Sequence, residues 1–127
     1  MQDKVMPNGK WVFDKQVADC FDDMLNRSIP DYSTMRACVF EIGKRFIHND
    51  SAILDIGCSN GKSFEAFVDY ADAHNGVEEM NITVDGYEIS EPMANEAKSR
   101  FIGRDFVNIH NSDILDDFPD KKFDLVL

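Results

Sequence analysis

The sequence predicts an α/β fold with three α/β/α layers, in which a mostly parallel sheet lies between helices. From residue 52 onward, short apolar runs of strand length alternate with longer segments whose apolar residues recur every three or four positions. The first run, 52–56, leads directly into a glycine-rich turn, as a buried parallel strand does before a helix. Because strands that alternate with helices form parallel sheets through crossover connections, the pattern favours this fold class.

Two amphipathic helices are predicted ahead of the first strand. Between residues 12 and 25, the spacing of the apolar residues places on one helix face Phe13, Val17, Phe21, Met24 and Leu25. Residues 27–32 interrupt this helix. A second helix, capped by Ser33 or Thr34, is expected to reach about residue 46. Its inward face is predicted to contain Met35, Cys38, Val39, Ile42 and Phe46.

We expect residues 1–50 to form a helical cap and residues 51–127 to form a core with four strands. The predicted strands are Ala52–Ile56, Asn81–Tyr87, Phe106–His110 and Phe123–Leu127. A helix from residue 62 to about 70 or 73 follows the first strand, with an apolar face made of Phe64, Phe67, Val68 and Ala71. A polar loop over 72–79 precedes the second strand. Ser90 is expected to cap a further helix that reaches residue 101.

Length and charge limit the classes of function. A chain of 127 residues with 43% hydrophobic residues can bury a single core. With 24 acidic against 13 basic residues, its net charge is −11, which repels nucleic acids and anionic membranes. We therefore expect no membrane association and no nucleic-acid binding by this segment alone. The residues 1–10 do not resemble a leader, and we expect a cytoplasmic protein.

No metal site is predicted. The three cysteines are irregularly spaced and form no C-x-x-C pair, and the histidines are scattered. Cys20 and Cys38 fall on apolar helix faces and are expected to be reduced core residues.

The candidate site begins in the turn after the first strand. In the segment 54–61, Leu-Asp-Ile-Gly-Cys-Ser-Asn-Gly, glycines stand at both ends of the turn. Gly57 would let the backbone turn sharply against a ligand, and Gly61 would let the helix start close to the strand. Such a turn also occurs as simple punctuation between a strand and a helix, so further residues are needed to predict a site.

Two acidic residues provide this further evidence for a site, because each stands directly after the carboxyl end of a later strand. Glu88 follows the second strand, where a carboxylate can accept hydrogen bonds from both ribose hydroxyls of a nucleotide. Asp113 follows the third strand and could accept the exocyclic amine of adenine. Either acid alone could be a solvated loop carboxylate. The occurrence of both acids at successive strand ends, after a glycine-rich turn, predicts a site for an adenosyl ligand.

These residues resemble the class I S-adenosylmethionine-dependent methyltransferases. The segment 54–61 is similar to their motif I, Glu88 to their ribose-binding acid, Ser112-Asp113 to their adenine-binding pair, and 123–126 to the start of their fourth strand. The resemblance implies a Rossmann-like fold that binds S-adenosylmethionine or S-adenosylhomocysteine. It implies a cofactor site formed by Asp55, Gly57, Cys58, Ser59, Gly61, Glu88, Ile89, Asp113 and Ile114.

Within that site, the resemblance places Asp55 and the turn around the methionine moiety, where Asp55 orders the turn and reaches the amino group. Ser59 supplies the small side chain needed there. Methyl transfer is an in-line displacement at an activated carbon, so placement of the nucleophile supplies much of the rate. No catalytic residue is assigned within the chain, and the methyl acceptor stays open.

The resemblance extends upstream to the carboxy-S-adenosylmethionine synthase group. Phe13-Asp14-Lys15-Gln16-Val17-Ala18 and Arg27-Ser28-Ile29-Pro30-Asp31-Tyr32 are similar to its N-terminal helices, whose R-S-[IV]-P-G-Y segment folds over the cofactor. Arg27 and Tyr32 thus become further cofactor-binding candidates, although Tyr32 could equally pack between helix and loop. Asp31 replaces the glycine of the group, and the arginine that holds its extra carboxylate would lie beyond Leu127.

The last predicted strand ends at Leu127 with an open apolar edge, which soluble proteins avoid. The sequence therefore predicts a fragment of a longer methyltransferase, or a partner or second copy that covers the edge. Three functions stay open: a methyltransferase, a carboxy-S-adenosylmethionine synthase-like enzyme, and a non-catalytic binding or assembly module.

Overall fold

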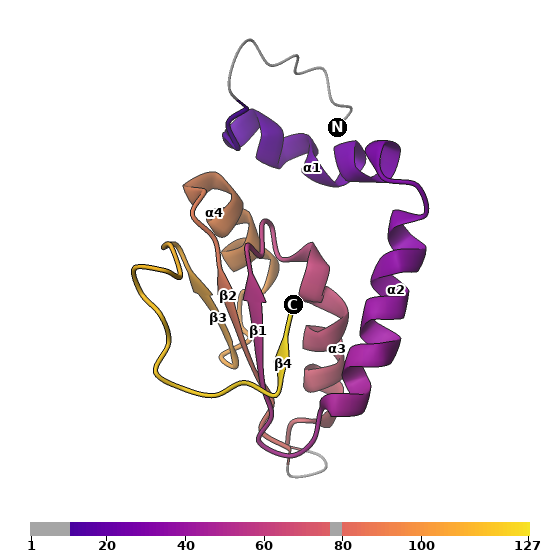
Figure 1. The fold of residues 1–127 in the computed structure, drawn as a ribbon, viewed down its shortest axis with the longest axis vertical. Helices are drawn as coiled ribbons and strands as arrows, with labels where there is room; N and C mark the ends of the chain where they lie inside the picture. Colours follow the sequence, from indigo (N-terminus) through magenta and orange to yellow (C-terminus); the bar gives the residue numbers. More distant parts are fainter. Residues whose placement is uncertain (1–10, 77–79) are drawn as a thin grey trace.

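A four-stranded parallel sheet forms the centre of the molecule, with the strand order β3–β2–β1–β4 (Figure 1). It is seen in a computed structural model that describes residues 11–76 and 80–127. The strands are β1 (Ala52–Ile56), β2 (Thr83–Tyr87), β3 (Val107–His110) and β4 (Leu125–Val126). The predicted α/β fold is confirmed. Strand β1 has its predicted bounds, and the other strands are shorter than predicted.

Helices precede β1 and connect the first three strands. They are α1 (Lys15–Ser28), α2 (Tyr32–Gly43), α3 (Glu65–His74) and α4 (Glu91–Arg100), with 3₁₀ turns η1 (Lys44–Phe46) and η2 (Lys62–Phe64). Ser90 caps α4 as predicted, since its side chain accepts a hydrogen bond from the N–H of Met93. Helix α2 begins at Tyr32, before either predicted cap, and its N-cap residue Asp31 has a left-handed conformation with φ of 53°.

Part of the predicted 72–79 loop is helical, because α3 continues to His74. The rest of that loop at 77–79, and the N-terminal segment 1–10, lie outside the described residues. No helix of the described chain is long and apolar enough to cross a membrane.

The main core lies between one face of the sheet and α3. Ile53 and Val84 are fully buried there, and they pack in one cluster with the predicted apolar face of α3 and with Phe101 at the end of α4. On the opposite face, Leu54 and Tyr87 pack against Ile114 and Phe123 from the segment that joins β3 to β4. The carboxyl ends of β1, β2 and β3 lead into the loops of the site at the edge of the sheet that faces α1 (Figure 1).

The two N-terminal helices pack on different partners. Helix α1 buries Val17, Ala18 and Phe21 against Met93 of α4. Helix α2 contacts α3 through Phe40, whose ring centre lies 5.1 Å from that of Phe67. Figure 1 shows α1 above the strand ends and α2 alongside α3.

The predicted inward face of α2 is wrong. Met35 and Ile42 on α2 are 48% and 62% exposed, and Phe46 in the following turn η1 is 57% exposed. Val39 and Cys38 on the same helix are also exposed, whereas Cys20 on α1 is buried as predicted. Periodicity identifies the apolar face of a helix but not the element that covers it. In this structure α2 reaches the core through Phe40 instead.

Candidate functional site

The turn after β1 presents an open glycine to solvent. Gly57 has a φ of +76°, and a Cβ atom at this position would meet nothing within 4 Å. The N–H groups of Gly57 and Cys58 both donate to the carbonyl of Tyr87, at 2.9 and 3.0 Å. The backbone is therefore fixed to the end of β2 while its outer side stays free for a ligand.

Gly61 at the other end of the turn allows a close approach that the sequence analysis did not anticipate. A Cβ there would lie 2.5 Å from the ring of Phe101, and its φ is +81°. The close approach is therefore to the side chain at the end of α4.

Glu88 joins the second loop to the glycine turn. Its Oε2 accepts a hydrogen bond from the N–H of Ser59 at 2.9 Å, and its Oε1 accepts one from the N–H of Ser90 at 2.7 Å. The residue is 8% exposed. A carboxylate has about four lone-pair sites, so acceptor capacity remains for hydroxyl donors of a ligand.

Asp55, at the base of the same turn, is a second buried acid. It is 4% exposed, and its Oδ2 accepts a hydrogen bond from the hydroxyl of Ser63. Burial raises the pKa of Asp55, the bond from Ser63 opposes this rise, and the negative charge of Glu88 adds to it. The structure thus brings the two predicted acids Asp55 and Glu88 into electrostatic contact beside the turn, where a cationic ligand would be stabilised.

Cys58 can offer only its main chain to a ligand. Its side chain is 1% exposed, and a Cβ at Gly86 on β2 would lie 2.7 Å from its Sγ. Burial, reinforced by the charges of Asp55 and Glu88, raises the pKa of the thiol to about 12. The sequence analysis missed the role of Gly86, although a glycine inside a strand is a signal of close approach.

The third loop is tied to the second by Asn111. Its side-chain amide donates to the carbonyls of Glu88 and Ile89, at 2.9 and 3.2 Å. Asp113 is exposed, and its Oδ1 accepts a hydrogen bond from the N–H of Leu115 at 2.9 Å. Ile89 is 74% exposed beside Glu88, whereas Ile114 is buried with Leu54 and Tyr87. The two predicted isoleucines therefore occupy different environments.

The two candidates from the cap, Arg27 and Tyr32, have different partners. Arg27 forms an ion pair with Asp23 on α1 at 2.9 Å. Tyr32 is the first residue of α2, and its ring centre lies 5.5 Å from the guanidinium carbon of Arg36. Tyr32 thus belongs to a cation–π contact at the start of α2 that the sequence analysis did not anticipate.

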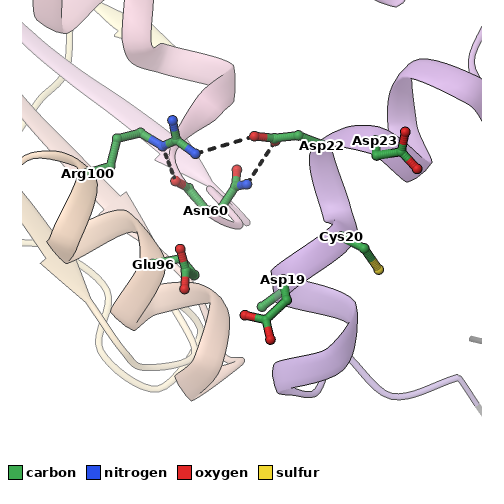
Figure 2. A pocket seen from close by; sticks show the side chains of 8 residues that line it. Asp19, Cys20, Asp22, Asp23, Asn60, Glu96 and Arg100 are labelled. Carbon is green, nitrogen blue, oxygen red and sulfur yellow. Dashed lines mark hydrogen bonds and ion pairs between the residues drawn. The ribbon is translucent and has the colours of Figure 1, made fainter. Parts of the chain in front are cut away.

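A polar network that the sequence analysis missed holds the turn from the side of α1 and α4. Asn60 donates to Asp22 at 2.9 Å, and Arg100 donates to the carbonyl of Asn60 at 2.9 Å. Arg100 also pairs with Glu65 at 3.0 Å and Asp22 at 3.5 Å. Residues 22, 60 and 100 lie far apart in sequence, so no local motif signals their contact (Figure 2).

The same network borders a cavity of about 290 Å³. Half of its lining is acidic, and the lining consists of Ala18, Asp19, Cys20, Asp22, Asp23, Asn60, Glu96 and Arg100. Asn60 is the only member that comes from the glycine turn. The cavity therefore adjoins the turn, but none of the predicted cofactor-binding residues lines it.

The fold and this arrangement at the strand ends define the class of protein. The family model for the methyltransferase domain matches residues 54–127. The chain belongs to this family, and its fold is that of the class I S-adenosylmethionine-dependent methyltransferases.

Among characterised relatives, the chain is 33% identical over 106 residues to the carboxy-S-adenosyl-L-methionine synthase of Actinobacillus succinogenes, covering 84% of this chain and 39% of that protein. Among solved structures it resembles DesVI of Streptomyces venezuelae, with a TM-score of 0.58, 24% identity, and 86% and 41% of the two chains covered. A methyltransferase of Thiobacillus denitrificans in complex with S-adenosyl-L-homocysteine gives a TM-score of 0.52 at 18% identity, covering 72% and 34%. The chain spans about two fifths of the length of the first of these relatives.

Proposed function

We propose that this chain is the cofactor-binding part of an S-adenosylmethionine-dependent methyltransferase. The observation that carries the proposal is the pairing of Glu88 with the N–H of Ser59 beside an open Gly57. It places a buried acid, a free backbone surface and a second acid, Asp55, at adjacent strand ends. Ligands of open parallel sheets bind in this region, outside the carboxyl ends of the strands.

The residues present fit the chemical groups of the cofactor. The remaining acceptor sites of Glu88 suit the two ribose hydroxyls, and the acids near Gly57 suit an ammonium group and a sulfonium. At the end proposed for adenine, the buried hydroxyl of Ser112 has no partner within the described residues, next to Asp113. Ser59, Ile89, Ile114, Tyr32 and Arg27 remain proposed members of the site.

When bound, the cofactor supplies a methyl group activated by its sulfonium. This chain would then bind and orient it, with Gly57 and Gly61 shaping the turn and Glu88 fixing the ribose. Asp55 stays buried behind the turn and holds its conformation through Ser63. Because the reaction depends mainly on placement, these residues contribute by positioning the methyl group for in-line attack.

Calorimetric titration with S-adenosylhomocysteine tests the proposal. Wild type should bind it, and Glu88→Ala should weaken binding by at least about tenfold, because hydrogen bonds to a charged group are lost. Glu91→Ala removes the same charge from an exposed position at the start of α4 and serves as the matched control. A folded wild-type chain that binds no S-adenosylhomocysteine would contradict the proposal.

A second candidate is a carboxy-S-adenosylmethionine synthase-like enzyme. The relative from Actinobacillus succinogenes supports it, together with the similar N-terminal segment that ends in Tyr32. Mass spectrometry of the ligand that copurifies with the protein would separate the candidates, because the carboxylated cofactor differs in mass from S-adenosylmethionine. The methyl acceptor of the first candidate is left open.

The proposal divides the chain into a cap over residues 1–50 and a core over residues 51–127. In the described part of the chain, β4 pairs with β1 alone, and Val126 is 54% exposed. A protein partner or a second copy that covers this edge is the basis of the third candidate, a non-catalytic assembly module. Size-exclusion chromatography with light scattering tests it. The free cysteines support a reducing, cytoplasmic location.

A further inference from the structure

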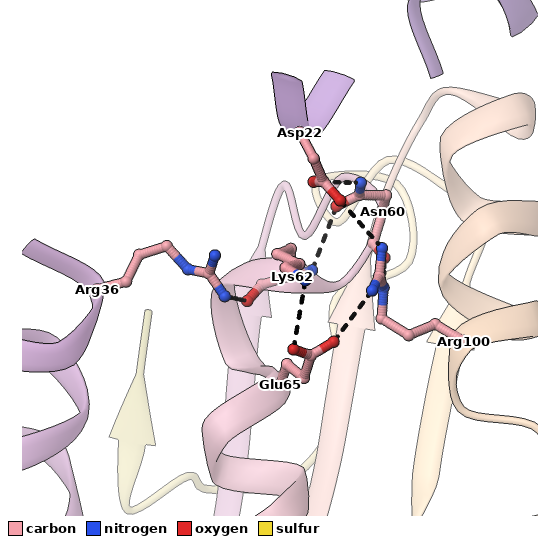
Figure 3. A network of polar contacts seen from close by, with 6 residues as sticks. All are labelled: Asp22, Arg36, Asn60, Lys62, Glu65 and Arg100. Carbon is pink, nitrogen blue, oxygen red and sulfur yellow. Dashed lines mark hydrogen bonds and ion pairs between the residues drawn. The ribbon is translucent and has the colours of Figure 1, made fainter. Parts of the chain in front are cut away.

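Arg36 on α2 is held against the segment that leaves the glycine turn. Its Nη2 donates a hydrogen bond to the carbonyl of Lys62, the first residue after Gly61. Its guanidinium carbon also lies 5.5 Å from the centre of the Tyr32 ring. Figure 3 shows the side chain reaching from α2 to this carbonyl. A cation therefore stands at the side of the turn that faces α2.

The donors of this guanidinium are not saturated by the protein. Of its five N–H donors, the buried one on Nε has no hydrogen-bond partner in the described part of the chain. Arg100, which also contacts the turn, is paired with Asp22 and Glu65. Arg36 forms no ion pair with a carboxylate among residues 11–76 and 80–127, although the whole chain contains 24 acidic residues.

A half-buried cation without a counter-charge is unfavourable, since its desolvation is not offset. The contacts with the Tyr32 ring and the Lys62 carbonyl also keep the guanidinium of Arg36 from turning into solvent. An anionic ligand group would compensate this charge. A carboxylate fits best, since the planar guanidinium donates two parallel hydrogen bonds to it.

We propose that Arg36 binds the carboxylate of the aminoacyl tail of the cofactor. This inference rests on the proposed function and assigns one further residue of the same site. The tail carries an ammonium and a carboxylate. Asp55, a buried acid, lies at the start of the turn, and Arg36 contacts the carbonyl of Lys62 directly after its end. The turn is thus flanked by an acid, which suits an ammonium, and by a cation, which suits a carboxylate.

Two ligands that differ in this tail test the assignment. S-Adenosylhomocysteine carries the aminoacyl group, and 5′-methylthioadenosine lacks it. In calorimetric titrations, Arg36→Met should weaken binding of S-adenosylhomocysteine at least tenfold and leave binding of 5′-methylthioadenosine unchanged. Arg36→Lys keeps the charge without the planar fork and should give an intermediate loss. Arg45→Met, at an exposed position in η1, should change neither affinity.

The outcomes separate this inference from the proposed function. If wild type binds neither ligand, the proposed function itself fails. If wild type binds both and Arg36→Met weakens both equally, or weakens neither, Arg36 has a purely structural role and the assignment is overturned. Circular dichroism establishes that each variant is folded. Should Arg36→Met not fold, the ratio of the two affinities in Arg36→Lys decides in the same way.

Discussion

The carboxylate of Glu88 accepts a hydrogen bond from the N–H of Ser59 at 2.9 Å, which joins the loop after β2 to the turn after β1. The other oxygen of Glu88 accepts the N–H of Ser90 at the cap of α4. One side chain therefore fixes three segments at the strand ends. The site residues are part of the framework, and substitutions there have consequences for stability as well as for binding.

Glu88→Ala should accordingly destabilise the chain without any ligand. Two backbone N–H groups lose a charged acceptor at a residue that is 8% exposed, and we expect a loss of about 2–4 kcal/mol in the free energy of unfolding. Urea denaturation followed by circular dichroism measures this. Glu41→Ala removes an exposed ion pair with Lys44 and should change stability by under about 1 kcal/mol. Equal stability of the two variants would argue against the role of Glu88.

Gly61→Ala should cost more than a substitution at a glycine with the same backbone conformation and free space. Gly61 and Gly103 have φ of +81° and +83°, but only at Gly61 would a Cβ collide with the ring of Phe101. Gly103→Ala therefore reports the conformational cost alone, about 1–2 kcal/mol. Gly61→Ala should lose about 1–3 kcal/mol more, because Phe101 must move. Thermal and urea unfolding of both variants would show whether this difference exists.

Arg100→Lys should loosen the contact between α1, the turn and α4. A lysine cannot reproduce the separate bonds that Arg100 makes with the carbonyl of Asn60 and with Glu65. We expect a loss of about 1–3 kcal/mol in unfolding free energy. Arg104→Lys affects a more exposed pair with Asp72 and should be nearly neutral. Faster proteolysis within α1 in Arg100→Lys, but not in Arg104→Lys, would show that the loss of stability arises at the contact with α1.

Asp55→Asn should stabilise the folded chain at neutral pH. The pKa of Asp55 is raised above 3.8 in the folded state, chiefly by burial, so the folded state binds the proton more tightly than the unfolded state. The ionised carboxylate therefore costs stability above the folded pKa, and this cost disappears as the pH falls below 3.8. Urea unfolding at pH 7 and at pH 4 should show a stability difference from wild type that shrinks toward the acid side.

The control for this titration is Asp69→Asn, at an exposed position on α3. It should show no comparable gain at pH 7. A wild type that is more stable than Asp55→Asn at pH 7 would mean that the bond from Ser63 outweighs the burial of the charge.

The three thiols should differ in reactivity. Cys38 is exposed, whereas Cys20 and Cys58 are buried, and the pKa of Cys58 is raised to about 12. A disulfide reagent at pH 8 should modify Cys38 rapidly in the native chain and the other two only after unfolding. Cys38→Ser should abolish the rapid phase. A rapid phase that survives this substitution would show that the interior near the turn opens readily.

The sequence predicted the helices and strands of the fold better than it predicted which of their faces are buried. β1 and the Ser90 cap are set by local signals, an apolar run before a glycine and a hydroxyl before a helix, and both appear as predicted. The face of α2 with Met35 and Ile42 failed, because its burial depends on which element packs against it. β4 is shorter than predicted, although backbone hydrogen bonds from Asp124 to Ala52 and from Leu127 to Leu54 continue its contact with β1 on both sides.

The candidate site was predictable where its residues follow strands in order. Asp55, Gly57 and Glu88 meet because parallel strands carry their carboxyl ends to one edge of the sheet. Arg36 and Arg100 were not predictable in this way. They reach the turn from helices, and their contacts with Lys62 and Asn60 depend on the packing angles of those helices, which no sequence spacing encodes.

The side chain of Cys58 occupies the space that a side chain at position 86 would need. A Cβ at position 86 would lie 2.7 Å from the sulfur of Cys58, 3.1 Å from its Cβ and 3.2 Å from the Cδ1 of Ile109. Alanine at 86 should thus be rejected beside cysteine and accepted best when position 58 is glycine. Position 58 must therefore become smaller before position 86 can become larger.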